Sequence, residues 1–248
     1  MESYKNFARV YDEFMDQTPY DTWFWNLQTV FSRFLVPKKG KILDLGCGTG
    51  KMSRRLSRAG FEVTAVDCSA QMLEIAANAS ADPVLYVMQD MVSLEVPEKM
   101  DAAISICDCL NYILDEKDLR EVFKRVRNSL KDGGIFLFDM NTRFKYEQIL
   151  ACNTFAEDRE DASFIWENFY DEEERINEYQ LSLFIKNERG TYDKFQELHL
   201  QKAYDTQEIC QMLLENGFVS AEVLDAETMR ELVEETERCY FIAQACTK

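Results

Sequence analysis

Short apolar runs alternate with amphipathic segments along most of the chain after residue 40. The apolar runs are Lys41–Leu45, Glu62–Val66, Val84–Gln89, Met100–Cys107 and Gly134–Asp139. The amphipathic segments are Gly50–Ala59, Ala70–Ala79 and Asp118–Leu130. The apolar runs predict buried strands, and the amphipathic segments predict helices because their apolar side chains recur at helical spacing. Strands and helices in regular succession are typical of a doubly wound α/β sheet with parallel strands.

The alternation breaks between residues 153 and 203. Within this stretch Phe164–Tyr170 and Gln180–Ile185 alternate apolar and polar positions with period two, which predicts antiparallel strands with one covered face. The earlier pattern resumes with a helix at Asp205–Asn216 and strands at Phe218–Leu224 and Arg238–Ala245. We therefore expect a seven-stranded, mostly parallel sheet with a final antiparallel strand, interrupted by a small inserted antiparallel sheet.

Composition and charge narrow the classes of function. The 248 residues suit one α/β domain with an elaboration. Forty-five acidic and 28 basic residues give a net charge of −17, which repels phosphate backbones and anionic lipid head groups. Nucleic acid is therefore disfavoured as a partner. Arg54, Arg55 and Arg58 share one predicted helix, and we interpret them as a solvated face rather than a binding patch.

The sequence also bears on location, disulfides and metals. It contains neither a signal-peptide core nor a run of about 18 apolar residues, so we expect a cytoplasmic protein with no membrane partner. The eight cysteines are scattered, and several lie inside apolar runs, which favours buried free thiols over a disulfide framework. Cys107 and Cys109 have the wrong spacing for a zinc knuckle, and His199 has no second histidine, so we expect no metal site.

A glycine-rich loop follows the first predicted strand. The sequence from Asp44 to Gly50 places glycines at positions 46, 48 and 50, just after an acidic residue at the end of an apolar run. Glycines let the backbone turn sharply and approach a ligand closely. A P-loop would need four residues between its glycines and then Lys-Ser or Lys-Thr, and the dinucleotide fingerprint would need a glycine where Lys51 stands. Neither nucleotide motif fits.

This stretch resembles motif I of the class I S-adenosylmethionine-dependent methyltransferases, in which an acidic residue precedes glycines at alternate positions. The resemblance implies a Rossmann-like fold and S-adenosylmethionine as cofactor. It places that cofactor against Asp44, Gly46, Cys47, Gly48 and Gly50. The chemistry is consistent, because this ligand carries an ammonium and a sulfonium but no phosphate, and a nearby carboxylate attracts it.

Two further acidic residues follow later predicted strands. Asp67 lies about 20 residues past the glycines, where an acid that accepts the ribose hydroxyls is expected, and Cys68 lies beside it. By resemblance, Asp90 receives the adenine amino group and Met91 packs on the ring. Each acid has a structural alternative, Asp67 as the cap of the next helix and Asp90 as part of a polar turn.

The end of the fourth predicted strand is expected to border the transferable methyl group, because ligands of open α/β sheets lie beyond the carboxyl ends of the strands. The residues concerned are Cys107, Asp108, Asn111 and Tyr112. Asp108 and Asn111 have an alternative role as loop and capping residues. The absence of an Asn-Pro-Pro-Tyr or Asp-Pro-Pro-Tyr sequence here weakens the case for methylation of DNA bases or glutamine.

The first 36 residues are rich in aromatic side chains and predict two short helices. Phe7–Met15 together with Tyr20–Trp23 resembles the N-terminal cap of a group of bacterial methyltransferases of undefined substrate. Such caps close over the cofactor, so Tyr11, Tyr20 and Trp23 are expected to touch its methionine part, unless they only pack a helix on the sheet. The expected parts are a cap at 1–36, a methyltransferase domain at 37–152 and 204–248, and a lid at 153–203.

In-line methyl transfer from a sulfonium can be accelerated by alignment of donor and acceptor without a base. Candidates for a base are His199, Tyr112 and Asp108. Glu197, His199 and Gln201 share one face of a predicted strand, and that face is a candidate wall of the pocket. The side chains expected to select a substrate are Trp166, Tyr170, Arg175 and His199.

The acceptor is expected to be a small molecule, because the chain is acidic and carries no appended RNA-binding segment. Two alternatives stay open. One is an RNA or protein methyltransferase, and the other is a non-catalytic module that binds S-adenosylmethionine.

Overall fold

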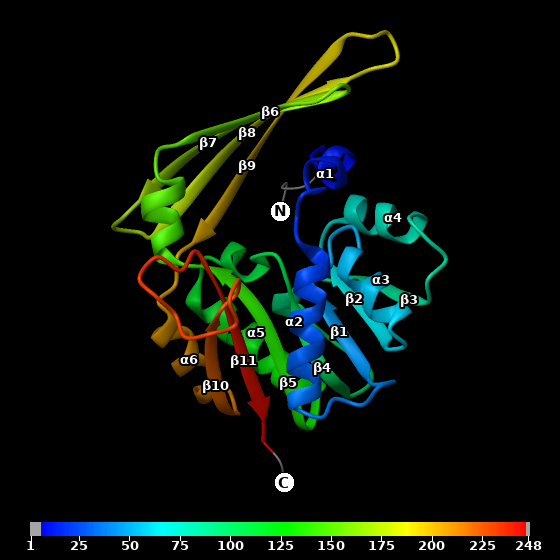
Figure 1. Ribbon diagram of the computed structural model, residues 1–248, viewed down its shortest axis with the longest axis vertical. Helices are drawn as coiled ribbons and strands as arrows, with labels where there is room; N and C mark the ends of the chain where they lie inside the picture. The colour runs from blue at the N-terminus through cyan, green and yellow to red at the C-terminus, as the bar shows by residue number, and fades with distance from the viewer. Residues whose placement is uncertain (1–5, 247–248) are drawn as a thin grey trace.

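Seven strands form a mixed sheet through the middle of the protein (Figure 1). The computed structural model describes residues 6–246, so residues 1–5 of the predicted cap and residues 247–248 lie outside the described residues. The strands are β1 (Lys41–Leu45), β2 (Glu62–Asp67), β3 (Val84–Met88), β4 (Met100–Ser105), β5 (Leu130–Asn141), β10 (Phe218–Asp225) and β11 (Arg238–Ala245). Their order is β10-β11-β5-β4-β1-β2-β3. β11 runs antiparallel to both neighbours and the other neighbouring pairs are parallel, so the predicted Rossmann-like doubly wound sheet is confirmed.

Helices cover both faces of this sheet. They are α2 (Tyr20–Arg33), α3 (Lys51–Arg58), α4 (Ala70–Asn78), α5 (Glu116–Ser129) and α6 (Thr206–Glu215). In β5, the buried Ile135 and Leu137 pack in one core with α2 and α3, whereas Phe136 and Phe138 pack in a second core with α5 and α6. Successive side chains of a strand point to opposite faces, so a continuous apolar run is needed to fill both cores.

β5 begins at Leu130 rather than at the predicted Gly134. The residues Asp132-Gly133 do not end the pairing of β5 with β4. Met100 already pairs with Leu130, and the register then shifts before Ala102 pairs with Ile135. Gly133 lies in the left-handed region, with φ +75°. The turn residues therefore form an irregularity inside the strand instead of its boundary.

A second, four-stranded antiparallel sheet stands apart from the first, above it in Figure 1. Its strands are β6 (Thr154–Asp158), β7 (Ala162–Asp171), β8 (Ile176–Lys186) and β9 (Tyr192–Lys202), in that order. It is inserted between β5 and α6, which confirms the predicted small antiparallel sheet. Its period-two pattern follows from one buried face, where Leu181 and Leu183 of β8 are covered.

The two predicted N-terminal helices pack in different places. α1 (Ala8–Phe14) lies beneath the four-stranded sheet, where Val10 joins Leu181, Leu183 and Ile185 in one apolar cluster (Figure 1). α2 instead packs on the seven-stranded sheet, and its buried Leu27 belongs to the main core. Of the predicted cap, α1 is therefore the part that leaves the main sheet.

Three short helical turns connect the remaining elements at the carboxyl ends of the strands. They are η1 (Met91–Ser93), η2 (Cys109–Tyr112) and the π-helical η3 (Lys145–Leu150). Between residues 6 and 246 no helix has the length and apolar character that crossing a membrane requires. Cys239 is buried, but Cys68, Cys152 and Cys246 are exposed, so the expectation of buried thiols is wrong for these three. They follow strand or helix ends, where the core does not reach.

Phe138 gives a test of the core on the α5 side. Its ring stacks on Phe241 with centroids 4.9 Å apart and is fully buried. We expect Phe138→Ala to lower the free energy of unfolding by roughly 3–5 kcal/mol, because it leaves a cavity between close-packed rings. Val219→Ala, at an exposed apolar position of β10, should change it by less than about 0.5 kcal/mol. Urea titration measures both, and equal losses would contradict this account of the core.

Candidate active site

The glycine-rich loop between β1 and α3 follows a path that requires its glycines. Gly46, Gly48 and Gly50 have φ values of +69°, +53° and +74°, in the left-handed region that glycine adopts freely. The N–H groups of Gly46 and Cys47 both donate to the Val66 carbonyl, at 2.8 and 3.0 Å, so the loop is tied to the end of β2.

The three glycines differ in what a side chain would meet. A Cβ on Gly46 would lie 2.7 Å from the Cys109 sulfur, and a Cβ on Gly50 would strike the Tyr86 hydroxyl. A Cβ on Gly48 would have no atom of the described residues within 4 Å. Gly48 is therefore the point where the backbone faces open space, as close approach of a ligand requires.

Asp67 ends β2 and holds the loop from the side. Its carboxylate accepts hydrogen bonds from the N–H groups of Gly48 and Ser69, each 2.8 Å away. A carboxylate offers about four lone-pair sites, so capacity remains for the two hydroxyls of a ribose. Burial raises the pKa of Asp67, against the lowering effect of its backbone hydrogen bonds. The side chain that caps α4 is Ser69, which accepts from the N–H of Met72, so the alternative role of Asp67 as helix cap is not the one observed.

Asp44 lies in β1 beneath the loop and is 2% exposed. Its carboxylate accepts a hydrogen bond from the Ser53 hydroxyl of α3. Burial raises the pKa of Asp44 to about 7, although the Ser53 hydrogen bond lowers it, and the charge of Asp67 raises it further. A cationic ligand in the cavity above would favour the ionised form of this carboxyl.

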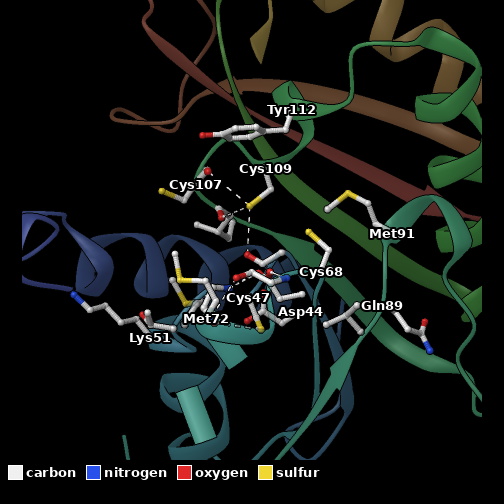
Figure 2. Close-up of a pocket in the computed structure, with 18 of the residues that line it drawn as sticks. Asp44, Cys47, Lys51, Cys68, Met72, Gln89, Met91, Cys107, Cys109 and Tyr112 are labelled. Carbon is white, nitrogen blue, oxygen red and sulfur yellow. Dashed lines mark hydrogen bonds between the residues drawn. The ribbon is translucent and has the colours of Figure 1, made fainter. Parts of the chain in front are cut away.

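A cavity with about 1050 Å³ of empty space, partly open to solvent, lies over the loop. The predicted cofactor residues that line it are Asp44, Gly46, Cys47, Gly48, Asp67, Cys68, Asp90, Met91, Cys107, Tyr11 and Tyr20. In Figure 2, Tyr112 lies across this cavity from Asp44 and Met72. The fold thus brings the carboxyl ends of four parallel strands and two N-terminal tyrosines to one small-molecule site.

Two predicted cofactor residues lie outside this cavity. Gly50 has φ +74°, and a Cβ there would lie 2.4 Å from the Tyr86 hydroxyl, so the turn itself requires this glycine. Trp23 lines a second cavity instead, and the Arg238 guanidinium lies over its ring, 5.4 Å from the centroid. The cation over this ring therefore comes from β11, and a contact of Trp23 with the cofactor stays a prediction.

Several lining residues were not predicted. Thr49 and Lys51 lie in and beside the glycine motif, so the motif could have indicated them. No sequence motif indicated Met72 or Gln89. Asp90 lines the cavity and also caps η1, because its carboxylate accepts from the Val92 N–H at 2.9 Å. The turn role and a ligand role are therefore compatible for Asp90.

α1 connects the glycine loop with the four-stranded sheet. Its Asp12 accepts a hydrogen bond from the Thr49 hydroxyl at 2.7 Å and pairs with Lys51 at 3.4 Å. The Tyr11 hydroxyl lies 3.8 Å from the sulfur of Cys107. α1 is thus held over the first cavity by polar contacts on one side and by its apolar cluster on the other.

The chain makes a strained turn at the end of β4. Cys107 and Asp108 have φ values of +77° and +49°, a conformation that costs each residue about 1–3 kcal/mol. Asp139 of β5 accepts the N–H groups of both residues, at 2.6 and 3.1 Å. Arg238 of β11 pairs with the carboxylates of Asp108 and Asp139. These contacts offset the strain and fix the turn beside both cavities.

The same cluster sets the charge of its carboxyls. Burial disfavours ionisation of Asp108, but the Arg238 guanidinium and the hydrogen bond from Gln201 outweigh it and lower its pKa. The pKa of Asp139 stays raised, because burial there exceeds the stabilisation by Arg238 and the charge of Asp108 adds to it. Asp108 is therefore an ionised partner of Arg238 and a poor proton acceptor.

The second cavity lies between α1, the four-stranded sheet and the strained turn, with about 1250 Å³ of empty space. Aromatic residues that line it are Phe7, Tyr11, Phe14, Trp23, Tyr112, Phe164, Trp166 and Tyr179. Polar residues that line it are Asp108, Asn141, Lys145, His199, Gln201 and Arg238. Tyr11, Cys107 and Tyr112 line both cavities, so the two meet at these three side chains.

Buried side-chain amides join the four-stranded sheet to the strained turn and to β5. Gln201 of β9 donates to Asp108 at 2.7 Å and accepts from the hydroxyls of Tyr146 and Tyr179. Asn111, fully buried, donates to the Lys202 carbonyl at 2.8 Å, where β9 returns to the main fold. Asn111 is thus structural, which matches its predicted alternative role.

The base candidates His199, Tyr112 and Asp108 all line the second cavity. Glu197, His199 and Gln201 do share the buried face of β9, as predicted. His199 and Tyr112 come from different sheets, yet the Tyr112 hydroxyl lies 3.2 Å from Nδ1 of His199.

Two side chains expected to select a substrate lie elsewhere. Arg175 sits in the turn between β7 and β8 and pairs with Asp205 and Glu208 at the start of α6, at 2.9 and 3.2 Å. Tyr170 stacks on Tyr146, with centroids 6.0 Å apart, outside the cavity lining. Period-two alternation gives the face of a strand but not the length over which that face borders a cavity, so a role of these two side chains in substrate selection stays a prediction.

The predicted basic helix face is occupied by ion pairs. Arg55 pairs with Asp21 and Arg58 with Asp82, each at 2.7 Å, and Arg54 donates to the Thr49 carbonyl. This arrangement agrees with a solvated face. Within residues 6–246, no three His, Cys, Asp or Glu side chains gather in a way that could hold a metal ion.

Comparisons with known proteins agree with this geometry. The methyltransferase domain family matches residues 42–134. The chain is 39% identical over 244 residues to "Putative methyltransferase YqeM" of Bacillus subtilis, covering 97% of this chain and 96% of that protein. A crystal structure of an S-adenosylmethionine-dependent methyltransferase from Clostridium acetobutylicum superposes with a TM-score of 0.86 at 28% identity, covering 98% and 99% of the two chains. The sugar N-methyltransferase KedS8 of Streptoalloteichus has a similar fold, with a TM-score of 0.78 at 17% identity over 96% and 93%.

Asp67 gives a direct test of the first cavity. Asp67→Ala should weaken binding of S-adenosylmethionine by roughly 2–4 kcal/mol, because two charge-assisted hydrogen bonds to the ribose are lost. Asp82→Ala is the control, since Asp82 precedes β3 at the opposite end of the sheet and pairs with Arg58. Titration calorimetry measures both variants, and unchanged affinity in Asp67→Ala would remove this residue from the site.

The raised pKa of Asp44, about 7, predicts a pH dependence of binding. At a pH below this pKa, Asp44 carries a proton in the free protein. A cationic ligand favours the ionised carboxylate, so this proton must leave when the ligand binds. Affinity for S-adenosylmethionine should therefore rise between about pH 5.5 and 7.5, with a limiting slope of roughly tenfold per pH unit. Asp44→Asn, which cannot ionise, should show a shallower rise in the same calorimetric series. Equal slopes would contradict titration of Asp44.

Proposed function

Since this chain belongs to the S-adenosylmethionine-dependent methyltransferases, we propose that it transfers the methyl group to a small molecule held in the second cavity. The observation that carries the proposal is the meeting of two cavities at Tyr11, Cys107 and Tyr112. A donor in one cavity and an acceptor in the other are then aligned by the fold. Alignment of this kind supplies a large part of the acceleration in a direct displacement.

The proposed cofactor position uses the first cavity from end to end. Asp67 accepts the ribose hydroxyls, and Asp90 and Met91 hold the adenine. Asp44 and the backbone at Gly48 face the methionine part, where the carboxylate attracts the ammonium. When bound, S-adenosylmethionine supplies a methyl group activated by the adjacent sulfonium.

The second cavity has the properties of a site for a compact acceptor. Its aromatic walls come from α1, α2 and the four-stranded sheet, and such walls bind planar or ring-shaped molecules. α1 and residues 153–203 cover it, which supports the interpretation of the inserted sheet as a lid.

Polar groups in this cavity favour an acceptor with polar substituents. The buried Nε1–H of Trp166 has no hydrogen-bond acceptor among the described residues. Lys145 lies at the floor, where burial lowers its pKa and the charge of Arg238 lowers it further. A bound molecule with hydrogen-bond acceptors would satisfy the indole N–H. Sugar N-methylation by the structurally similar KedS8 supports a small acceptor.

Methyl-labelled S-adenosylmethionine and a fractionated cell extract test the proposal. After incubation, label should appear in the fraction of metabolites and not in RNA or protein. Asp67→Ala serves as the control, because it should lower labelling in every fraction without changing the distribution. Label confined to RNA or protein would reject the small-molecule acceptor and leave the methyltransferase assignment intact.

Adjacent residues of β7 provide a matched test of the lid. Trp166 lines the second cavity, whereas Ile165 points to the opposite face and is 40% exposed. Trp166→Ala should lower labelling of the metabolite fraction by at least about tenfold, since it removes an aromatic wall and a hydrogen-bond donor worth roughly 1.4 kcal/mol or more. Ile165→Ala should keep the wild-type rate, and both should bind S-adenosylmethionine normally. Equal rates in the two variants would show that this face does not contact the acceptor.

A further inference from the structure

Three polar side chains form a line from the junction of the two cavities into the second sheet. The Tyr112 hydroxyl lies 3.2 Å from Nδ1 of His199, and Nε2 of His199 lies 3.3 Å from Oε2 of Glu197. His199 and Glu197 are 4% and 8% exposed, so water screens this line little. The spacing suits a neutral imidazole that accepts the phenol proton at Nδ1 and carries its own proton on Nε2, toward the carboxylate.

The other oxygen of Glu197 reaches the N-terminal segment. Oε1 accepts the N–H groups of Asn6 and Phe7, at 2.6 and 3.0 Å, just before α1 begins. One carboxylate therefore fastens the cap and orients the imidazole at the same time. The charge on Glu197 favours both contacts, because hydrogen bonds to an ionised acceptor are stronger than neutral ones.

The position of Tyr112 connects this line to the reacting atoms. Tyr112 lines both cavities, so its side chain lies where they meet. Titratable and charged groups that face or surround His199 are Glu197 on its own strand, Tyr179 on β8, Tyr112 on η2, Tyr11 on α1, and Asp108, Lys145 and Arg238 on the cavity floor. Asp108 and Arg238 pair with each other, which leaves the tyrosine–histidine–glutamate line as a path for a proton.

We propose that Tyr112, His199 and Glu197 form a proton relay for an acceptor hydroxyl. Docking of the N-terminal segment on Glu197 completes this relay. The inference rests on the proposed function of the two cavities. The acceptor proton passes to the Tyr112 oxygen while the phenol proton moves to Nδ1 of His199. The acceptor oxygen forms its bond to the methyl carbon, and the carbon–sulfur bond breaks with its electron pair left on sulfur. The positive charge lost from sulfur reappears on the imidazolium, where Glu197 stabilises it.

Tyr112 is the catalytic residue in this scheme, because it touches the acceptor, and His199 and Glu197 act through it. Tyr112→Phe keeps the ring but removes the hydroxyl, and His199→Gln removes the proton acceptor. Each should lower labelling of the fraction that the wild-type protein labels by about a hundredfold. Gln196→Ala, on the exposed face of the same strand, should retain the wild-type rate.

A pH series separates a relay from a merely structural role. The wild-type rate at saturating S-adenosylmethionine should fall toward acid pH, because a protonated imidazole cannot accept the phenol proton, whereas the residual rate of His199→Gln should lack this fall. Mass spectrometry of the product should find the label as an O-methyl group. Wild-type rates in Tyr112→Phe and His199→Gln, the same acid limb in both proteins, or an N-methyl product would each overturn the relay.

Hydrogen exchange tests the role of Glu197 without an acceptor. In Glu197→Gln, amides of residues 6–14 should exchange at least several-fold faster than in the wild-type protein, whereas in His199→Gln they should change little. Unaltered exchange in Glu197→Gln would reject the coupling to the cap. Failure of the relay can be told apart from failure of the proposed function. Label in RNA or protein would reject the small-molecule acceptor, whereas wild-type labelling by the Tyr112 and His199 variants would reject the relay.

Discussion

The partly buried Arg238 guanidinium holds together the parts of the protein that make the two cavities. It joins the carboxylates of Asp108 and Asp139, from the ends of β4 and β5, and its own strand is β11. Through Asp108 it also reaches Gln201 of the inserted sheet, and its face covers Trp23 of α2. Burying these charges is costly unless each is paired, so loss of one partner would leave the others uncompensated. The strained turn where the two cavities meet persists because this cluster surrounds it.

Around that cluster the protein separates two tasks. The carboxyl ends of β1 to β3 carry the residues of the first cavity, and the inserted sheet with α1 supplies most walls of the second. Asn111 fixes the place where β9 rejoins the main fold. The strands that line the first cavity can therefore stay the same when the inserted sheet changes, which suits a fold used for many functions.

Local patterns in the sequence were sufficient for the order of elements and for most of the first cavity. The loop from Asp44 to Gly50, and Asp67 after β2, could be placed next to one another because each position follows from residues close in the chain. The contacts of Trp23 with Arg238 and of Arg175 with Glu208 could not be predicted, because these partners come from other segments of the chain. Such contacts leave no periodic signal. The contact between Tyr112 and His199 was likewise invisible, although both residues were candidates individually.

The attachment of α1 has a consequence for the time order of folding. Its polar anchor on the glycine loop lies 37 residues away in the chain, but its contact with Glu197 spans 190 residues or more. A ribosome completes β9 long after it has completed α1, so α1 is among the last elements to reach its final place. Closing so long a loop is slower than forming contacts between residues close in the chain. The nascent chain therefore passes through a stage in which the cofactor loop can form while the aromatic residues of α1 still lack their cover, and chaperones would meet the protein at that stage.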